Sequence, residues 1–418
     1  MAAAVARLRG LAMTDLNDIP GADPKDRPAV TLNPGGHRRA VAGHPWIFSN
    51  EVRMDAAAKA LPPGGLVRIV ANHGEAIGVA TFNPHPLIAA RLLSRDADAA
   101  IDVGFLGSCL ARALALRERL VPSPFYRLIH AEADGLPGAV IDRYGDVAVV
   151  QANTAGMTLL LPVLLAALDE TLRPRAVLIR NDSAIRALEG LERQVEWAKG
   201  TVEEPVELVE NGVRFVADLA HGQKTGWFFD QRENRALVAS LARDARVLDL
   251  YAYVGGFAVQ AAVAGAAEAV AVDRSAQALE AAEKSAALNG VEGRCRFVKG
   301  EAFAEAAQLR AAGESFNIVV ADPPAFVKSK KELAQGAKGY RKLVRLVAPL
   351  VRPEGFLFVA SCSYHVDRAL FAEMVRRGLA DASRSGRILA ETGAAMDHPV
   401  HPALPESAYL KATLLQLD

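Results

Sequence analysis

The chain has 418 residues, and a single hydrophobic core stops growing at about 250–300 residues, so two or three domains are expected. Hydrophobic residues make up 51% and charged residues 23%, an ordinary globular composition that excludes a largely disordered or fibrous chain. Basic and acidic side chains number 48 each; this balance argues against a strongly basic nucleic-acid-binding protein but allows a local basic surface.

The N-terminal segment lacks the features of a targeting sequence. Its alanine-rich start is interrupted by Arg7 and Arg9, so no signal-peptide core forms. Polar, proline-containing sequence follows Met13, which is a second candidate start beside Met1. We expect residues 1–27 to form a disordered tail.

Cysteine usage and hydropathy indicate a cytoplasmic protein without a membrane span. No apolar run approaches the roughly 20 residues that cross a bilayer. The cysteines are odd in number, far apart and without a CxxC pair, so we expect free thiols in a reducing compartment and neither a disulfide framework nor a metal site. These cysteines are Cys109, Cys295 and Cys362.

Residues 28–96 have the pattern of a small β-barrel-like domain. Short alternating or apolar runs are separated by glycine and proline turns, and no long helical pattern appears. The expected strands contain the sequences AVTL, LVRIV, AIGVATF and LIAARLL.

Residues 97–211 predict a small central domain of mixed α+β type. Apolar spacing indicates helices near 100–120 and 157–170. The expected strands contain RLIHAEA, AVIDRY, VAVVQAN and AVLIRN. Turn residues connect the first three of these strands, which favours local antiparallel pairing.

Residues 212–418 predict an α/β domain with a doubly wound, Rossmann-like sheet. The pair Asn211-Gly212 predicts a tight hairpin at its start, because a type I′ turn needs two residues that tolerate positive φ. After the hairpin, seven apolar strand patterns follow, the first six separated by helical patterns, which is typical of parallel pairing. No helical pattern separates the last two, so we expect the final strand to be antiparallel.

The first motif of this domain is an apolar strand that ends at Asp249 and is followed by Gly255-Gly256 at a helix start. Glycine allows a ligand to approach the backbone closely, and helix N-terminal amides favour anionic groups. The next strand ends in Asp273, 24 positions after Asp249, close to the spacing of about 20 residues at which an acidic side chain binds ribose hydroxyls. A nucleotide-containing cofactor is therefore favoured over a plain strand–turn–helix. NAD stays open, although the glycines do not follow GxGxxG.

The second motif is Asp322-Pro323-Pro324 at the end of a later strand. Two prolines make a rigid exit from the sheet and hold the carboxylate over the crevice at the strand ends. Dehydrogenases have no use for this motif, whereas methyltransferases that act on nucleobases use it to bind a base edge. A simple Pro-Pro turn is the alternative reading.

Cys362 ends the following strand in the triplet Ser361-Cys362-Ser363. Taken alone, a strand-end cysteine is more often a small buried apolar residue. The fourth and fifth strands of a doubly wound sheet are neighbours, however, so Cys362 is expected to open onto the same crevice as Asp322.

Taken together, these motifs resemble those of the ribosomal RNA large subunit methyltransferase I family, which makes 5-methylcytidine in bacterial 23S ribosomal RNA. The resemblance extends over nearly the whole chain after the tail. It includes GGHRRAVAGHPWIFSNEV, RLIHAEADGLPGAVIDRYGD, GQKTGWFFDQRENR, DPPAFVKSKKEL, the SCS triplet and DHPVHPALPESAYLK. It implies an N-terminal PUA domain that binds RNA and a class I methyltransferase domain.

The resemblance also implies S-adenosylmethionine as the cofactor, without a metal. Asp273 would hold the ribose hydroxyls, Glu301 would lie near the adenine, and Gln231 and Arg232 would close over the methionine end. The main chain of the first glycine-containing motif would flank the methionine part. The implied cofactor-binding residues are Gln231, Arg232, Asp249, Tyr251, Gly255, Asp273, Glu301 and Asp322.

The implied catalytic residues are Cys362 and Asp322. Cytosine C5 is a poor nucleophile, and a thiolate that adds to C6 moves electron density onto C5. Asp322 would hydrogen-bond the base near N3. Some related enzymes have a second cysteine directly after Asp-Pro-Pro, where this chain has Ala325, so the acceptor of the C5 proton is unassigned. His365 is near in sequence but has the character of a surface histidine.

Two alternative functions remain open from the sequence. A methyltransferase for guanine N7 or an exocyclic amine would need no thiolate. A noncatalytic RNA-binding protein would have lost its methyltransferase activity. RNA is the expected partner, and a homodimer is left open.

Three basic clusters are candidates for an RNA-binding surface, although charge runs are usually solvated surface. They are residues 37–39, residues 328–331, and residues 338–342 with Arg345. Trp46 and Phe48 are candidates for stacking on a base.

Overall fold

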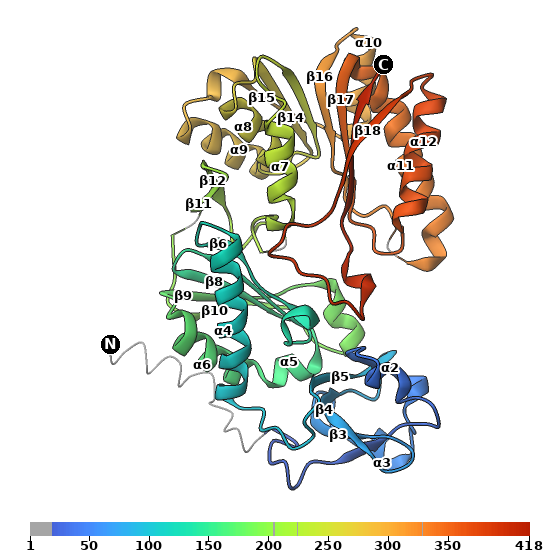
Figure 1. Cartoon of the computed structure of the whole chain (residues 1–418). Coiled ribbons are helices and arrows are strands. Elements are labelled where there is room, and N and C mark those ends of the chain that lie inside the picture. The colour runs from blue at the N-terminus through green and yellow to red at the C-terminus, as the bar shows by residue number, and fades with distance from the viewer. Residues whose placement is uncertain (1–18, 204, 224, 328) are drawn as a thin grey trace. The chain divides into compact units, whose positions relative to one another are not determined.

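The computed structural model describes residues 19–203, 205–223, 225–327 and 329–418 (Figure 1). The chain forms two compact units. Unit 1 contains the described residues up to Glu203 together with Leu219–Gly226 and Asp397–Pro405. Unit 2 contains Glu204–Asp218, Trp227–Met396 and Glu406–Asp418. Two short stretches of the predicted range 212–418 therefore belong to unit 1 by their contacts.

The expectation of a disordered tail over residues 1–27 is wrong for its last part. Residues 1–18, and with them Met13, lie outside the described residues. Ile19 is buried against the core of unit 1. The buried Arg27 donates to the backbone carbonyls of Gly21 at 3.0 Å and Ala97 at 2.9 Å. These contacts anchor residues 19–27, which the polar composition did not indicate.

The N-terminal part of unit 1 is a five-stranded sheet in the order β1-β3-β4-β5-β2. All four predicted strands are present, and their apolar residues surround a core of their own. The strand Trp46–Phe48 was not predicted, because three residues are too few to show alternation. The elements are β1 Ala29–Thr31, α2 Arg38–Val41, β2 Trp46–Phe48, α3 Ala56–Lys59, β3 Leu66–Val70, β4 Ala76–Phe82 and β5 Ile88–Ser94.

The central part of unit 1 is a second five-stranded sheet, in the order β10-β9-β8-β7-β6. Two long helices, α4 and α6, pack against each other and contribute to its core. The strand Gln194–Lys199 was missed because it is short and its apolar residue Val195 is exposed, so its alternation does not mark a buried face. The elements are α4 Val103–Leu120, β6 Phe125–His130, β7 Ala139–Tyr144, β8 Val147–Ala152, α5 Ala155–Leu159, α6 Leu161–Leu172, β9 Ala176–Asn181 and β10 Gln194–Lys199.

Unit 2 begins with the predicted hairpin of β11 Val206–Glu210 and β12 Val213–Ala217. Asn211 and Gly212 have φ of 52° and 79°, as a type I′ turn requires. A seven-stranded sheet follows in the order β15-β14-β13-β16-β17-β19-β18. Its strands are β13 Arg246–Leu250, β14 Glu268–Asp273, β15 Cys295–Lys299, β16 Phe316–Ala321, β17 Val351–Ser361, β18 Gly386–Thr392 and β19 Lys411–Leu417.

The first five strands of this sheet are parallel, and β19 lies antiparallel between β17 and β18. The predicted antiparallel final strand is confirmed. Its cause is the absence of a helix after β18, since a parallel connection needs a crossover of a dozen or more residues, usually a helix.

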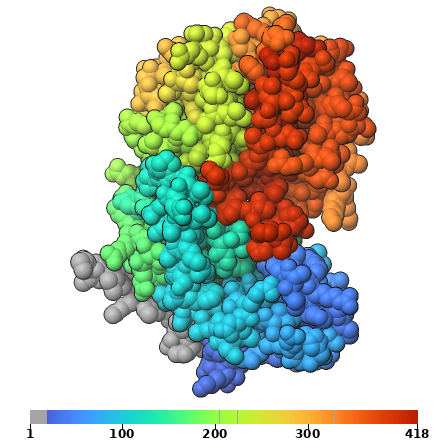
Figure 2. Space-filling model, in the orientation of Figure 1, coloured from blue at the N-terminus to red at the C-terminus, as the bar shows by residue number. Residues whose placement is uncertain are grey.

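Helices cover both faces of the sheet of unit 2. One apolar core joins it to α10, α11 and α12, and two smaller cores join its other face to α7 and α8, beside which α9 packs. In Figure 2, α12 and the C-terminal strands contribute to the orange and red surface of this unit. The helices are α7 Arg232–Ala239, α8 Gly256–Val263, α9 Ala276–Leu288, α10 Ala302–Ala311, α11 Leu333–Val347 and α12 Arg368–Asp381. Across the described parts of the chain, none of the helices is long and apolar enough to cross a membrane.

Candidate functional site

The predicted site residues of unit 2 gather at the carboxyl edge of its sheet. The parallel strands β13, β14, β16 and β17 all end at this edge, so the residues that follow them are neighbours. Ala321 pairs with both Leu250 and Val359 in register. Asp322 therefore follows β16, which lies between β13, the strand before the glycine motif, and β17, the strand before Cys362.

The loop after β13 has a backbone conformation suited to close contact with a ligand. Tyr251, Tyr253 and Gly255 have φ of 66°, 50° and 75°, and positive φ is unfavourable for a tyrosine. A Cβ atom on Gly255 would lie 2.8 Å from the Cβ of Ala282. Residues in such conformations cluster at ligand-binding loops. This loop leads into the N-terminus of α8.

Asp273 connects this loop to the start of α9. One carboxylate oxygen accepts the backbone N–H of Tyr253 at 2.9 Å, and the other accepts that of Ser275 at 2.8 Å. A carboxylate has about four lone-pair positions, so both oxygens retain capacity for ribose hydroxyls. The Tyr251 hydroxyl oxygen is buried and has no hydrogen-bond partner among the described residues. Burial raises the pKa of Tyr251, and the nearby Glu301, the residue expected near the adenine, raises it further.

Asp249 lies beneath the loop, fully inside the protein. Its carboxylate accepts the backbone N–H of Ala258 at 3.1 Å. Burial raises the pKa of Asp249 to about 8, the hydrogen bond from Ala258 opposes this, and the nearby Asp322 and Asp273 raise it further. Three carboxyl groups thus interact at one sheet edge, and a pKa of about 8 keeps Asp249 mostly protonated at neutral pH.

The raised pKa of Asp249 predicts a pH dependence of stability in the cofactor-free protein. Folding favours the protonated carboxyl group; this contribution is complete below its ordinary pKa of 3.8 and is lost as the pH rises through about 8. The free energy of unfolding of the wild type should therefore fall relative to Asp249→Asn as the pH increases over this range. The loss is at most about 1.4 kcal/mol per pH unit. Denaturant titrations of both proteins at several pH values measure it, and parallel pH curves would contradict it.

Asp322 is held by a chain of side-chain hydrogen bonds. The amide nitrogen of Gln231 donates to Oδ2 of Asp322 at 2.8 Å, and that of Asn234 donates to Oε1 of Gln231 at 2.6 Å. The hydroxyl of Thr392 donates to Oδ1 of Asn234 at 2.6 Å. The structure therefore brings Gln231 to the predicted base-binding carboxylate, and Asn234 and Thr392 orient it.

Cys362 is partly buried directly after β17. The next residue, Ser363, is fixed by two contacts: its hydroxyl lies 2.7 Å from that of Tyr340 and accepts the backbone N–H of Val327 at 3.2 Å. Val327 follows the Asp-Pro-Pro-Ala-Phe segment. The two segments that carry Asp322 and Cys362 are thus joined by hydrogen bonds.

Helix α11 positions the Asp-Pro-Pro segment through two glycines. A Cβ on Gly336 would lie 2.4 Å from the carbonyl oxygen of Phe326, and one on Gly339 would lie 2.9 Å from its ring. Phe326 also packs against the ring of Tyr340, with centroids 4.8 Å apart. Glycine at these positions lets the helix approach the segment closely.

The described contacts of the Arg232 side chain are with Phe229 and Glu210, not with residues at this sheet edge. Its guanidinium carbon lies 5.4 Å from the centre of the Phe229 ring, and a guanidinium nitrogen lies 3.9 Å from the buried Glu210. Glu210 also accepts from Arg235 at 2.5 Å and from the indole N–H of Trp227 at 2.9 Å. The assignment of Arg232 to the cofactor stays a prediction.

Sequence reasoning missed the residues that support the site. Asn234 belongs to the DQREN string, and Tyr340 lies within a predicted basic cluster, but neither position shows a partner in sequence. Glu210 precedes the hairpin turn and resembles an exposed strand residue. Only its apolar neighbours offered a signal of burial. The missed supporting residues are Glu210, Trp227, Asn234, Arg235, Tyr340 and Thr392.

Several residues of the predicted RNA-binding surfaces contact other side chains of the protein. Trp46 donates to Glu132 at 2.8 Å, and Arg39 lies 4.5 Å above the ring of Phe48. Arg341 forms a bidentate pair with Asp381. Lys328 lies outside the described residues. The indole N–H of Trp46 and one face of the Phe48 ring are thus occupied within the protein. Stacking of either ring on a base stays a prediction.

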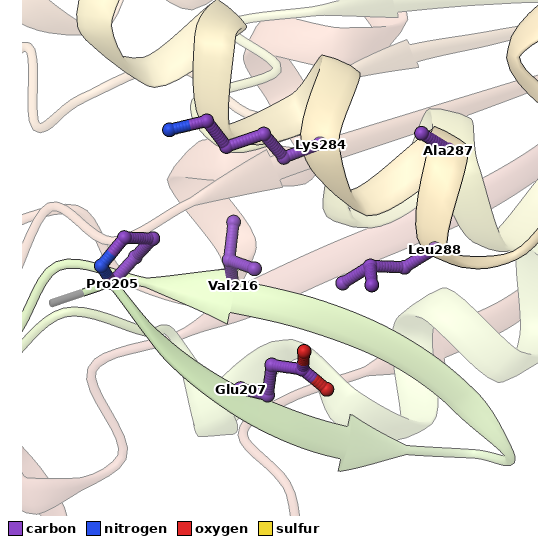
Figure 3. Close-up of a pocket in the computed structure, with 6 residues that line it drawn as sticks. All are labelled: Pro205, Glu207, Val216, Lys284, Ala287 and Leu288. Atoms are coloured by element: carbon purple, nitrogen blue, oxygen red, sulfur yellow. The ribbon is translucent and has the colours of Figure 1, made fainter. Parts of the chain in front are cut away.

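A hollow of about 470 Å³ lies away from this edge, between the hairpin β11–β12 and α9 (Figure 3). Apolar side chains of Val216 and Leu288 face it. Of the residues that line it, Glu207 and Lys284 are charged. It contains none of the predicted site residues. We assign the chemistry to the strand ends, because the strained loop and the interacting carboxyl groups lie there.

Comparisons with known proteins agree with the fold. A family described as S-adenosylmethionine-dependent methyltransferase matches residues 186–415, and a family described as PUA-like domain matches residues 30–95. A Ribosomal RNA large subunit methyltransferase I from Cronobacter sakazakii is 35% identical over 392 residues, which cover 91% of this chain and 97% of the relative. Its namesake from Aliivibrio fischeri is 36% identical over 391 residues, 92% of this chain and 98% of the relative.

Solved structures share the architecture. A putative SAM-dependent methyltransferase from Streptococcus mutans has a TM-score of 0.79 and 19% identity, over 93% of this chain and all of that chain (100%). A putative methyltransferase complexed with SAH has a TM-score of 0.80 and 19% identity over the same shares. The predicted α/β methyltransferase fold and the PUA-like N-terminal domain are confirmed.

Proposed function

The chain belongs to the ribosomal RNA large subunit methyltransferase I family, and we propose that it methylates C5 of a cytidine in 23S ribosomal RNA through a covalent bond to Cys362. It is an S-adenosylmethionine-dependent RNA methyltransferase. The proposal concerns the atom that is methylated and the residues that carry the reaction.

The placement of Cys362 beside Asp322 is the observation that carries this proposal. The two residues follow adjacent parallel strands, and hydrogen bonds of Ser363 join their segments. Methylation of a guanine or adenine nitrogen uses a lone pair of the base and needs no thiol. Methylation of cytosine C5 needs a nucleophile at C6, and a partly buried cysteine at the base-binding edge supplies one.

The cofactor-binding residues fit S-adenosylmethionine. Bound S-adenosylmethionine supplies a methyl group on a positively charged sulfonium. Asp273 has acceptor capacity for the ribose, and the positive-φ loop allows close approach of the main chain at Tyr251 and Gly255.

The proposed reaction assigns a separate role to each catalytic side chain. The sulfur of Cys362 forms a bond to C6, and the resulting electron density at C5 forms the new C5–methyl bond. The bond between that methyl group and the sulfonium sulfur breaks, and S-adenosylhomocysteine leaves. Asp322, oriented by Gln231, binds the base at N3, and its carboxyl group supplies a proton there as negative charge develops on the ring. Loss of the C5 proton then expels the sulfur of Cys362 and restores the ring. A base within a helix stack is unreachable, so the target must be unpaired or flipped out.

Partner and location follow from this assignment. RNA is the substrate, and we propose that the PUA-like domain contributes to binding it. We expect the protein to act in the cytoplasm with its ribosomal substrate.

Nucleoside analysis of the product tests the proposed function. The protein is incubated with methyl-labelled S-adenosylmethionine and ribosomal RNA from cells that lack its gene, and the RNA is digested to nucleosides. We expect the label in 5-methylcytidine. Label in a methylated guanosine or in an amine-methylated base would replace the proposal with nitrogen methylation. Cofactor binding by calorimetry without transfer to any RNA would favour the noncatalytic alternative.

A further inference from the structure

Lys411 is a buried cation next to the proposed nucleophile. It begins β19, and its side chain is 3% exposed. Its ammonium donates to the backbone carbonyl of Ser363 at 2.8 Å and to that of Tyr409 at 2.8 Å. Among the described residues, no carboxylate lies within 4.0 Å of it. Burying a charge without an anion is costly, so a lysine at this position needs an explanation.

The sheet register explains how Lys411 reaches Cys362. Strand β19 runs antiparallel to β17, and Lys411 pairs with Ser361. The ammonium extends past the end of β17 to the carbonyl of Ser363, so its contacts span the position of Cys362. An ammonium has three donors. The two backbone carbonyls use two of them, which leaves one N–H for an anion that forms nearby.

The electrostatics of Lys411 agree with this placement. Burial lowers the pKa of Lys411 to about 8, while interaction with Cys362 opposes that shift. Arg368 lowers the pKa further and Asp367 raises it. Tyr340, which contacts Ser363, also interacts with Cys362. A negative charge on the sulfur of Cys362 would stabilise the desolvated ammonium of Lys411.

We propose that Lys411 is a positioning residue whose ammonium charge stabilises the thiolate of Cys362 and that its hydrogen bond to Ser363 orients the cysteine toward the base. This inference rests on the proposed function of Cys362 as the nucleophile. The thiol proton of Cys362 leaves to solvent, the sulfur retains the electron pair, and Lys411 keeps all three of its protons. When the sulfur later bonds to C6, the charge that Lys411 stabilised moves into the base.

The pH dependence of cysteine alkylation tests the inference without RNA or cofactor. The full chain is treated with iodoacetamide at a series of pH values, and modification of each cysteine peptide is quantified by mass spectrometry. Lys411→Gln keeps an N–H donor for the carbonyl of Ser363 but removes the charge, whereas Lys411→Arg keeps the charge. Cys295 is the internal control, and the buried Cys109 reports any unfolding.

Lys411→Gln should raise the alkylation midpoint of Cys362 by about one pH unit or more, which is about tenfold slower modification at neutral pH. Cys295 and Cys109 should be modified as in the wild type, and Lys411→Arg should retain the wild-type midpoint at Cys362. An unchanged midpoint in Lys411→Gln, or an equal shift in both variants, would overturn the inference. Methyl transfer by Cys362→Ala would instead overturn the proposed function. The alkylation experiment uses neither RNA nor cofactor, so its result does not depend on that outcome.

Discussion

Cys362→Ala should abolish methyl transfer to cytidine, with a fall in kcat/KM on the order of 10⁴-fold or more. Without the sulfur, no electron density moves onto C5, and the remaining residues only bind and orient the reactants. Transfer of labelled methyl groups to unmodified ribosomal RNA measures the loss. The effect should appear in kcat rather than in the binding of either substrate.

Cofactor binding separates the loss of chemistry from a loss of folding. The proposed cofactor contacts at Asp249, Gly255 and Asp273 lie on β13, β14 and the loop after β13, not on the segment of Cys362. Calorimetry with S-adenosylhomocysteine should therefore give the same affinity for Cys362→Ala and wild type. Cys295→Ala is the matched control, since it removes a thiol in β15 and should leave transfer intact. Activity retained in Cys362→Ala would show that the methyl acceptor needs no thiolate.

Glu210→Ala should lower the free energy of unfolding by about 3–5 kcal/mol, because it leaves a buried cation without its anion. Glu210 is fully buried (0% exposed) at the end of β11. It accepts hydrogen bonds from Arg235 and from the indole of Trp227, and the Arg235 guanidinium lies 4.4 Å from the Trp227 ring centre. Removing the carboxylate leaves both donors unpaired in an apolar environment.

The same hairpin supplies a control for this prediction. Glu207 pairs with Arg214 at 2.8 Å, but both side chains are about half exposed, at 53% and 50%. An exposed pair contributes about 0–1 kcal/mol, so Glu207→Ala should change little. Chemical denaturation of both variants gives the comparison, and equal losses would contradict the role of burial.

Loss of Glu210 should also weaken cofactor binding. A Cβ on Gly256 would lie 2.6 Å from Nε of Arg235, so Arg235 packs directly against the start of α8. If Arg235 loses its partner, the positive-φ loop that ends at Gly255 loses support. We expect a lower affinity for S-adenosylhomocysteine in Glu210→Ala and an unchanged affinity in Glu207→Ala, measured by calorimetry.

Local sequence signals determined the elements and the residues at the strand ends. The turn at Asn211-Gly212 needs only the φ preferences of two residues, and it formed as predicted. Asp273, Asp322 and Cys362 each follow an apolar strand pattern. Since parallel strands point the same way, such residues reach one edge of the sheet whatever the details of packing. Short or exposed strands such as β2 and β10 gave no comparable signal.

Tertiary structure alone decided which charged side chains are buried and what they contact. Thr392 orients Asn234 from 158 positions away, and Tyr409 donates to Asp230 from 179 positions away. Lys411 reaches Ser363 only because β19 inserts antiparallel beside β17. In the sequence, Lys411 has the pattern of a solvated residue, and only its apolar neighbours set Glu210 apart from one. The cost of burying a charge, and hence its pKa and its role, depends on the solvent and partners that the folded chain leaves around it.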